Sequence, residues 1–174
     1  MQMTIRRATA SDAVALAAFA EHCFRDAFGG VNTAENMNAY IATAYSPAIQ
    51  SAELADASIR TLVATDPEGG LAAYAQLRMR DDAPPAVGDA TIELWRFYVD
   101  RPHHGHGLAQ QLMEAVLDTA AALDRRALWL AVWDQNRRGR AFYHKLGFVE
   151  VGTQAFTLGD DVQTDVVMVL EFDD

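Results

Sequence analysis

A glycine-rich turn in the second half of the chain has the composition of an anion site. It reads Val99-Asp100-Arg101-Pro102-His103-His104-Gly105-His106-Gly107-Leu108-Ala109 and joins a strand-like segment to a helix-like one. Glycine lets the backbone bend sharply and lets a ligand approach main-chain N–H groups closely. The first N–H groups of a helix have no partner inside it, and the helix dipole favours an anion there. The turn therefore predicts a pyrophosphate site, with an ordinary tight connection as the alternative.

Other ligand motifs do not fit this turn. A P-loop requires Gly-Lys-Ser/Thr, which the turn lacks, and a dinucleotide fingerprint requires a third glycine where Gln110 stands. His103, His104 and His106 are spaced closely enough to bind zinc, but no further Cys or His lies nearby in the sequence. We therefore expect no metal.

Two further side chains can move protons. Tyr143 can donate a proton to a departing thiolate, or it can be a core tyrosine whose hydroxyl reaches the surface. Glu93 lies six residues before Val99, where a carboxylate can accept a proton from an amine or form an ion pair. Asn136 begins an expected helix, where it can cap that helix or hydrogen-bond an amide-bearing ligand such as pantetheine.

Predicted strands and helices follow one another along the chain, and they must position these residues. Strands are predicted at residues 4–7, 59–64, 71–79, 91–99, 128–132, 148–156 and 166–172. Helices are predicted after a cap at Ser11, within 32–57 with an interruption near Ser46-Pro47, and at 107–123 and 137–145. This order predicts a single mixed α/β domain over residues 1–174, with a central sheet and helices on both faces.

Both chemistry-bearing segments resemble signatures of the GNAT superfamily of N-acetyltransferases. The turn is similar to the pattern Gln/Arg-x-x-Gly-x-Gly/Ala at Gly107 and Ala109, and departs from it at His104, which can still donate to a phosphate. The segment from Asn136 to Phe148 is similar to Asn-x-x-Ala-x-x-Phe-Tyr-x-x-x-Gly-Phe, with Gly139 in place of Ala. That glycine should weaken the helix by about 1 kcal/mol.

The resemblance implies the GNAT fold, a twisted, mostly antiparallel sheet splayed at its middle. It implies direct transfer of an acetyl group from acetyl-CoA to a primary amine in a ternary complex, with Tyr143 as the acid and Glu93, or a water chain, as the base. A bulge near residues 97–99 would free backbone N–H groups for the thioester carbonyl. The residues implied to bind acetyl-CoA are Phe97, Tyr98, Val99, His104, Gly105, His106, Gly107, Leu108, Ala109, Asn136 and Tyr143.

Most of the chain, and residues 91–170 most strongly, is similar to bacterial PaiA-type spermidine/spermine N-acetyltransferases. The similarity lies in Phe156, in residues 159–165, 94–99 and 129–133, and in the region 24–45, whereas Gln154 stands where that group tends to have His. It implies a polyamine or another small amine as acceptor. An antibiotic or protein amine, or CoA binding without catalysis, remains the alternative.

Two sets of side chains are candidates for the acceptor site. Asp160, Asp161 and Asp165 can attract a cationic amine, or they can simply form a hairpin turn rich in Asp. The aromatic residues Phe24, Phe28 and Tyr40 can line the acceptor pocket or pack a helix onto the sheet.

Composition and net charge limit the classes of molecule that we expect this protein to bind. The net charge of −10 repels nucleic acid and anionic lipid and attracts cations. No apolar run reaches the roughly 18 residues of a membrane span. The lone Cys23 cannot form an internal disulfide, which suits the cytoplasm. We therefore expect a cytoplasmic monomer or homodimer acting on a small-molecule amine, with no nucleic-acid or membrane partner.

Overall fold

In the computed structural model, which describes residues 2–172, seven strands form one sheet in the order β1-β2-β3-β4-β5-β7-β6. The strands are β1 (Thr4–Arg7), β2 (Ile59–Thr65), β3 (Leu71–Arg78), β4 (Thr91–Val99), β5 (Ala127–Trp133), β6 (Val149–Leu158) and β7 (Asp161–Glu171). Every neighbouring pair is antiparallel except β4 and β5, which run parallel. The predicted mixed α/β class and mostly antiparallel sheet are confirmed.

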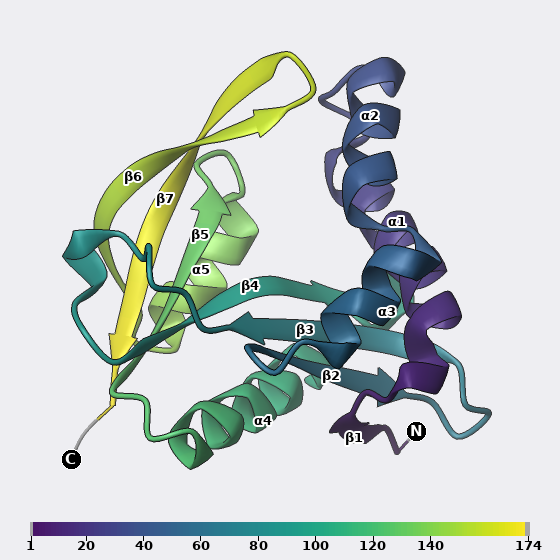
Figure 1. Cartoon of the computed structure of the whole chain (residues 1–174), viewed down its shortest axis with the longest axis horizontal. Coiled ribbons are helices and arrows are strands. Elements are labelled where there is room, and N and C mark those ends of the chain that lie inside the picture. Colours follow the sequence, from purple (N-terminus) through teal and green to yellow (C-terminus); the bar gives the residue numbers. More distant parts are fainter. Residues whose placement is uncertain (1, 173–174) are drawn as a thin grey trace.

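The sheet splays apart between β4 and β5. These strands pair only from Thr91 to Glu93, against Ala127 to Trp129, and then diverge (Figure 1). The pairing of β4 with β3 shifts register at Trp95, which is the extra residue of a β-bulge. The expected bulge position near residues 97–99 is therefore wrong. A bulge bends its strand and strengthens the local twist, so bending at Trp95 opens the sheet directly beyond the short paired segment.

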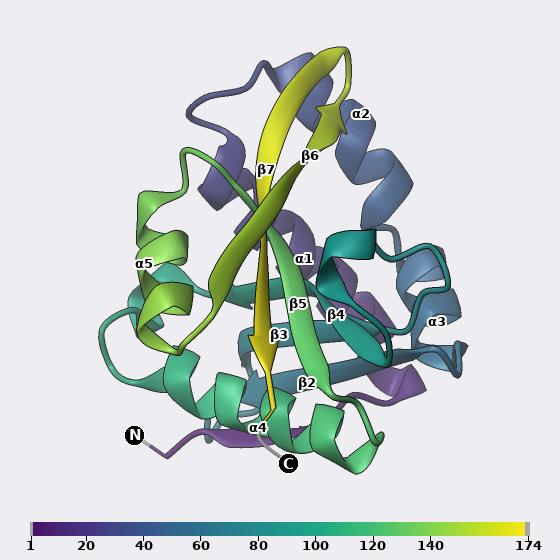
Figure 2. The same ribbon diagram turned by 90° about the vertical axis from the view of Figure 1, so that its left-hand side faces the viewer.

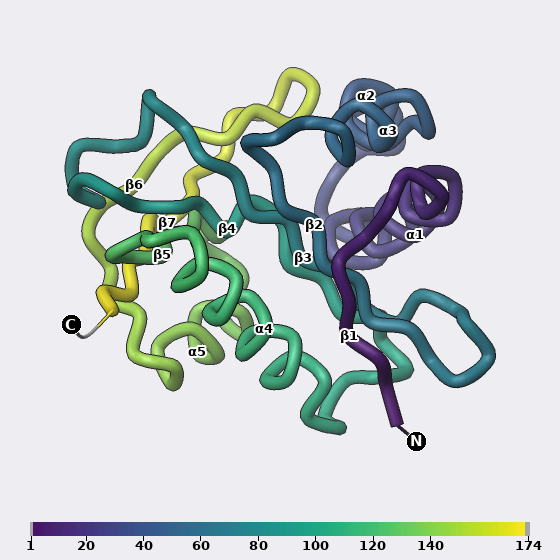
Figure 3. The backbone as a smooth tube through the Cα atoms, turned by 60° about the horizontal axis from the view of Figure 1, so that its bottom comes forward, coloured from purple at the N-terminus to yellow at the C-terminus, as the bar shows by residue number. Residues whose placement is uncertain are grey.

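Five helices cover the two faces of the sheet, as predicted. Helices α1 (Ala13–Phe28), α2 (Ala34–Ala44) and α3 (Pro47–Ala55) lie on one face, and α4 (Leu108–Ala122) and α5 (Arg137–Lys145) lie on the other (Figure 3). Short 3₁₀ segments span Ala10–Asp12, Pro85–Val87 and Arg101–His103. Each face has its own buried cluster, with Leu112 and Val116 of α4 in one and Leu16 and Phe24 of α1 in the other. Within residues 2–172, no helix combines the length and apolar character needed to cross a bilayer.

The start of α1 differs from the expected cap at Ser11. Ser11 lies inside the first 3₁₀ segment, and the turn is closed by Asp12, whose carboxylate accepts from the Thr9 N–H at 2.7 Å. The same carboxylate binds Arg6 at 2.8 Å, which connects β1 to α1. Asp12 precedes α1 without capping it through its side chain; its charged oxygens instead hold the Thr9 N–H and the Arg6 guanidinium together.

The β6–β7 hairpin is tighter than the sequence suggested. Only Gly159 and Asp160 form the turn, and β7 begins at Asp161 instead of Val166. Gly159 has φ +63°, which a two-residue hairpin turn requires. The hairpin rises to α2 (Figure 2), where Asn36 donates to Asp160 at 2.7 Å. Asp165 therefore lies inside a strand and not in an Asp-rich turn.

Candidate active site

The splay opens a cavity of about 780 Å³ that is lined from both faces of the sheet. On the side of α4 and α5 its lining includes His104, Ala109, Asn136, Arg138 and Tyr143. On the side of α1 and α2 it is lined by aromatic residues and by Asp165. From Leu94 onward, the edge of β4 that faces β5 has no strand partner, so backbone groups of β4 face this opening. One cavity thus joins the two faces through the break in the sheet.

The glycine turn connects β4 to α4 as the sequence predicted. Gly105 and Gly107 have φ +79° and +82°, conformations that favour glycine, and Gly107 precedes the first residue of α4. The first N–H groups of α4 therefore lie beside the cavity with no side-chain cap. Four predicted ligands do not line the cavity: Gly105, His106 and Gly107 are exposed in the turn, and Leu108 is buried in the core at 3% exposure.

His104 holds a neighbouring arginine rather than standing ready for a phosphate. Its Nε2 lies 2.7 Å from the Val99 carbonyl oxygen, which can only accept, so Nε2 donates. Its Nδ1 then accepts from Nη1 of Arg138 at 2.9 Å. Because both ring nitrogens are occupied, the expected donation from His104 to a phosphate does not fit this geometry. Arg138, which the sequence analysis did not single out, brings the positive charge to the turn, and its signal was the Arg-rich start of α5.

Asn136 caps α5, and this cap explains the unusual glycine in the second motif. Its Oδ1 accepts from the Gly139 N–H at 2.9 Å. A Cβ at position 139 would lie 2.7 Å from Nδ2 of Asn136, closer than real side chains approach. Gly139 therefore lets Asn136 cap the helix in this conformation. Asn136 also lines the cavity, so capping and ligand binding remain compatible.

Tyr143 lies on α5 at the deep side of the cavity. Its ring packs edge-on against Phe97 and Phe148, with ring centroids 6.4 Å and 5.6 Å apart. Burial raises the pKa of its hydroxyl above the ordinary value, because the phenolate would lose its hydration. The hydroxyl therefore stays protonated at neutral pH, as a proton donor must.

The three predicted ligands at the end of β4 separate onto two faces. Phe97 and Val99 pack with the core on the α4 side. Tyr98 packs with the α1 side and stacks on Tyr74, with ring centroids 5.6 Å apart. All three line the cavity.

Glu93 is an ion-paired residue. It is 4% exposed, and its carboxylate binds Arg78 through two contacts and Nη1 of Arg80 at 3.3 Å. Two guanidinium groups bind the carboxylate and occupy lone pairs that a substrate amine would need to reach. The ion-pair alternative therefore describes the geometry, and the role of Glu93 as a base stays a prediction.

Aromatic rings surround the other half of the cavity. Phe24 stacks on Tyr40 with centroids 4.7 Å apart, and Tyr40 meets Phe156 at 5.5 Å. Phe28 approaches Trp133 of β5 at 6.0 Å. These rings line the cavity and also pack α1 and α2 onto the sheet, so both interpretations of Phe24, Phe28 and Tyr40 hold.

Of the three candidate aspartates, only Asp165 lies in the cavity. Asp160 and Asp161 are exposed at the hairpin, where they bind Asn36 and Gln163. Asp165 is 8% exposed, and burial together with the carboxylate of Asp134 raises its pKa to about 6.

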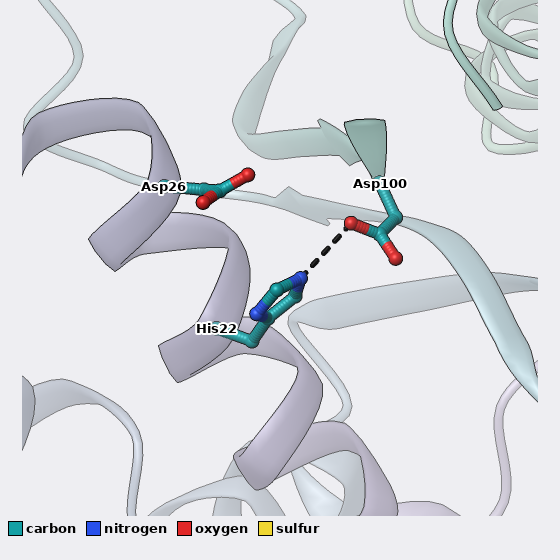
Figure 4. Close-up of side chains that lie close together, drawn as sticks. All are labelled: His22, Asp26 and Asp100. Carbon is teal, nitrogen blue, oxygen red and sulfur yellow. Dashed lines mark hydrogen bonds and ion pairs between the residues drawn. The ribbon is translucent and has the colours of Figure 1, made fainter. Parts of the chain in front are cut away.

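A second acidic cluster lies at the rim of the cavity. His22, Asp26 and Asp100 approach one another with donor atoms within 4.8 Å (Figure 4). Asp100 bonds Nε2 of His22 at 3.0 Å and accepts from the Arg101 N–H at 2.9 Å, and Asp26 pairs with Arg101 at 3.3 Å. These contacts account for the cluster, and we assign no ion to it.

Comparison with known proteins identifies the family. The model of the acetyltransferase (GNAT) family matches residues 18–148. An uncharacterized N-acetyltransferase of Mycobacterium bovis is 34% identical over 161 residues, which cover 92% of this chain and 98% of that protein. The crystal structure of the PaiA N-acetyltransferase from Thermoplasma acidophilum, in complex with coenzyme A, has a TM-score of 0.80 at 19% identity and covers 99% of this chain and 100% of its own.

A mutant form of the spermidine/spermine N-acetyltransferase SpeG from Vibrio cholerae has a TM-score of 0.66 at 19% identity, covering 98% of this chain and 95% of its own. At these identities the two structures establish the shared fold, whereas the family match and the mycobacterial relative establish the chemistry. The chain therefore belongs to the acetyltransferase (GNAT) family of acetyl-transferring enzymes.

Proposed function

We propose that this protein is an N-acetyltransferase that uses acetyl-CoA and acts on a primary amine, in particular a polyamine or another small amine. The observation that carries the proposal is the cavity through the splayed sheet, which joins a glycine turn on one face to an aromatic, acidic pocket on the other. This arrangement lets an activated acyl donor and an amine meet in one ternary complex.

Residues on the α4 side fit the acyl donor. Arg138 and the first N–H groups of α4 are suited to a pyrophosphate, because both offer charge or donors to an anion. Asn136 and the unpaired edge of β4 offer hydrogen bonds to the amides of a pantetheine arm. Acetyl-CoA supplies the activated acetyl group when bound. The crystal structure of the PaiA relative, which contains coenzyme A, supports this choice of donor.

The chain's own groups can then assist the transfer. Backbone N–H groups of β4 beyond Glu93 can polarise the acetyl carbonyl, since they face the opening without a strand partner. Tyr143 can protonate the departing thiolate, because its buried hydroxyl keeps its proton. We propose that water removes the proton of the amine, since Glu93 is engaged by two arginines.

The acceptor half favours a cation. Aromatic rings and an acidic residue line it, and the net charge of −10 attracts amines at a distance. The fold is shared with a SpeG protein that is named for spermidine and spermine, which supports a polyamine. The buried single thiol Cys23 agrees with a cytoplasmic enzyme.

Mass spectrometry of reaction products tests the proposal. The wild type is incubated with acetyl-CoA and, separately, with spermidine, spermine, lysine and an aminoglycoside. We expect acetylated spermidine or spermine, and we expect Tyr143→Phe to lower kcat by about 100-fold with little change in the KM for acetyl-CoA. Glu93→Gln, checked by thermal unfolding, reports whether that carboxylate contributes to the rate at all.

The alternatives give different products. Acetylation confined to the aminoglycoside or to lysine would replace the polyamine as acceptor. Binding of acetyl-CoA with no product from any amine would mean a protein that holds the donor without catalysis.

A further inference from the structure

We propose that Asp165 and the aromatic rings beside it form a subsite for an ammonium group of the acceptor that does not itself react. This inference rests on the proposed function and names the residue that selects a second positive charge. The acceptors it favours are diamines and polyamines.

Charge pairing within the cavity singles out Asp165. Each of the other carboxylates that line the cavity has a partner: Glu93 binds Arg78 and Arg80, Asp100 binds His22, and Asp26 binds Arg101. The buried Arg96 in the lining is paired with Glu53. Among residues 2–172, no basic side chain lies within ion-pair distance of Asp165. Arg138, the other cation in the lining, is held by His104 at the glycine turn. The acceptor half of the cavity therefore carries one uncompensated carboxylate.

The surroundings of Asp165 suit a cation and offer it no alternative partner. Its cross-strand neighbours are Trp133 on β5 and Gln154 on β6, both uncharged. Trp133 contacts the ring of Phe28, and Tyr40 contacts the ring of Phe156. A cation over such faces gains cation–π attraction, and the carboxylate adds a charge-assisted hydrogen bond.

Burial explains why the site favours a charged ligand. A carboxylate that is 8% exposed and lacks a counter-charge is unfavourable in the free protein. An ammonium ligand supplies the missing counter-charge, whereas a neutral group of the same size does not. The site therefore discriminates by charge more strongly than by shape.

The ammonium at Asp165 is a group that stays protonated through the reaction. An ion pair with a carboxylate stabilises the protonated amine, and a protonated amine cannot attack a carbonyl. The reacting nitrogen therefore lies elsewhere, toward the unpaired edge of β4 and Tyr143. A molecule with two amines separated by an alkyl chain can satisfy both positions, with the chain against the aromatic rings.

A pair of matched ligands tests the subsite. 1,4-Diaminobutane and 4-amino-1-butanol share a primary amine and a four-carbon chain, and they differ in whether the other end is a second ammonium group or a hydroxyl. Calorimetry with the CoA-saturated wild type should show binding of the diamine at least tenfold tighter than that of the amino alcohol. Asp165→Asn should remove this preference and leave the affinity for CoA unchanged. The control Asp118→Asn, which removes the same charge from the exposed face of α4, should keep it.

The binding readout separates this inference from the proposed catalysis. If the diamine binds the wild type tightly and Asp165→Asn weakly, the subsite stands even when no product forms. If the wild type does not prefer the diamine, or if Asp165→Asn keeps the preference, the subsite is wrong whatever the turnover. In the turnover assay, we expect the ratio of kcat/KM for diamine over amino alcohol to fall toward one in Asp165→Asn.

Discussion

At the scale of single residues, the side chains with proposed roles sit in environments that change their ordinary chemistry. Burial keeps the proton on Tyr143. Glu93 pairs with Arg78 and Arg80, so its carboxylate oxygens already have partners in the free protein. The ionised carboxylate of Asp165 lowers the stability of the free protein, because it is buried without a counter-charge. A buried carboxylate of this kind fits a binding site in which the ligand supplies the counter-charge.

This cost predicts that Asp165→Asn stabilises the free protein at neutral pH. Burial and Asp134 raise the pKa of Asp165 from 3.8 to about 6, while Tyr40 and Gln154 face it uncharged. The folded state thus binds this proton more tightly than the unfolded state, so stability falls as pH rises from about 4 to 6 and the penalty is constant above that range. The carboxylate borders an open cavity, so we discount the shift for solvent screening and expect the variant to be more stable by about 1–2 kcal/mol at pH 7.5.

Urea unfolding at pH 7.5 and at pH 3.5 measures this difference. The advantage of the variant should largely disappear at pH 3.5, where Asp165 is protonated in the folded state and mostly protonated in the unfolded state. A variant that is less stable than the wild type at pH 7.5 would show that the carboxylate has a stabilising partner in solution.

At the scale of elements, a contact between the glycine turn and α5 organises the donor half. His104 bridges the Val99 carbonyl and Arg138, and thereby holds a guanidinium of α5 beside the first turn of α4. Helix N–H groups and a guanidinium then approach the same volume from two elements. Together they form a stronger anion site than either element forms by itself.

Arg138→Ala should therefore weaken CoA binding. We expect the Kd of CoA to rise about tenfold, because one charge-assisted contact is lost, and the salt dependence of Kd to become shallower. Arg137→Ala is the matched control, since Arg137 is an exposed neighbour on the same helix and does not line the cavity. Calorimetry at two salt concentrations measures both effects, and equal losses in the two variants would contradict a specific role for Arg138.

The elements that the sequence predicted well are those with a strong local pattern. The bounds of β4 and α5 agree with the predictions, because β-branched and aromatic residues fill β4 and Asn136 and Gly147 bracket α5. The bulge at Trp95 and the early start of β7 depend on the register in which each strand pairs with its neighbour, which the local pattern of one strand does not encode. For the same reason the sequence identified Glu93 and Asp165 as candidates but not the side chains around them, and it did not single out Arg138.

At the scale of the whole molecule, the proposed function places the two substrates on opposite faces of the splayed sheet. Residues of α1, α2, β6 and β7 line the acceptor half of the cavity, and residues of α4 and α5 line the donor half. The helices α1 and α2 lie on one face of the sheet, and α4 and α5 lie on the other (Figures 1 and 3). The opening between β4 and β5 connects the two halves. The short parallel pairing of these strands is thus the feature on which transfer between the halves depends.

Backbone amide chemical shifts of the ¹⁵N-labelled protein, recorded first with CoA and then with spermidine added, test this arrangement most directly. We predict that CoA perturbs residues 94–99, 104–110 and 136–143, and that spermidine then perturbs the region around Trp133, Gln154 and Asp165 together with α1 and α2. If CoA instead perturbs the α1 and α2 side, or if both ligands shift the same residues on one face, delivery through the splayed sheet is contradicted.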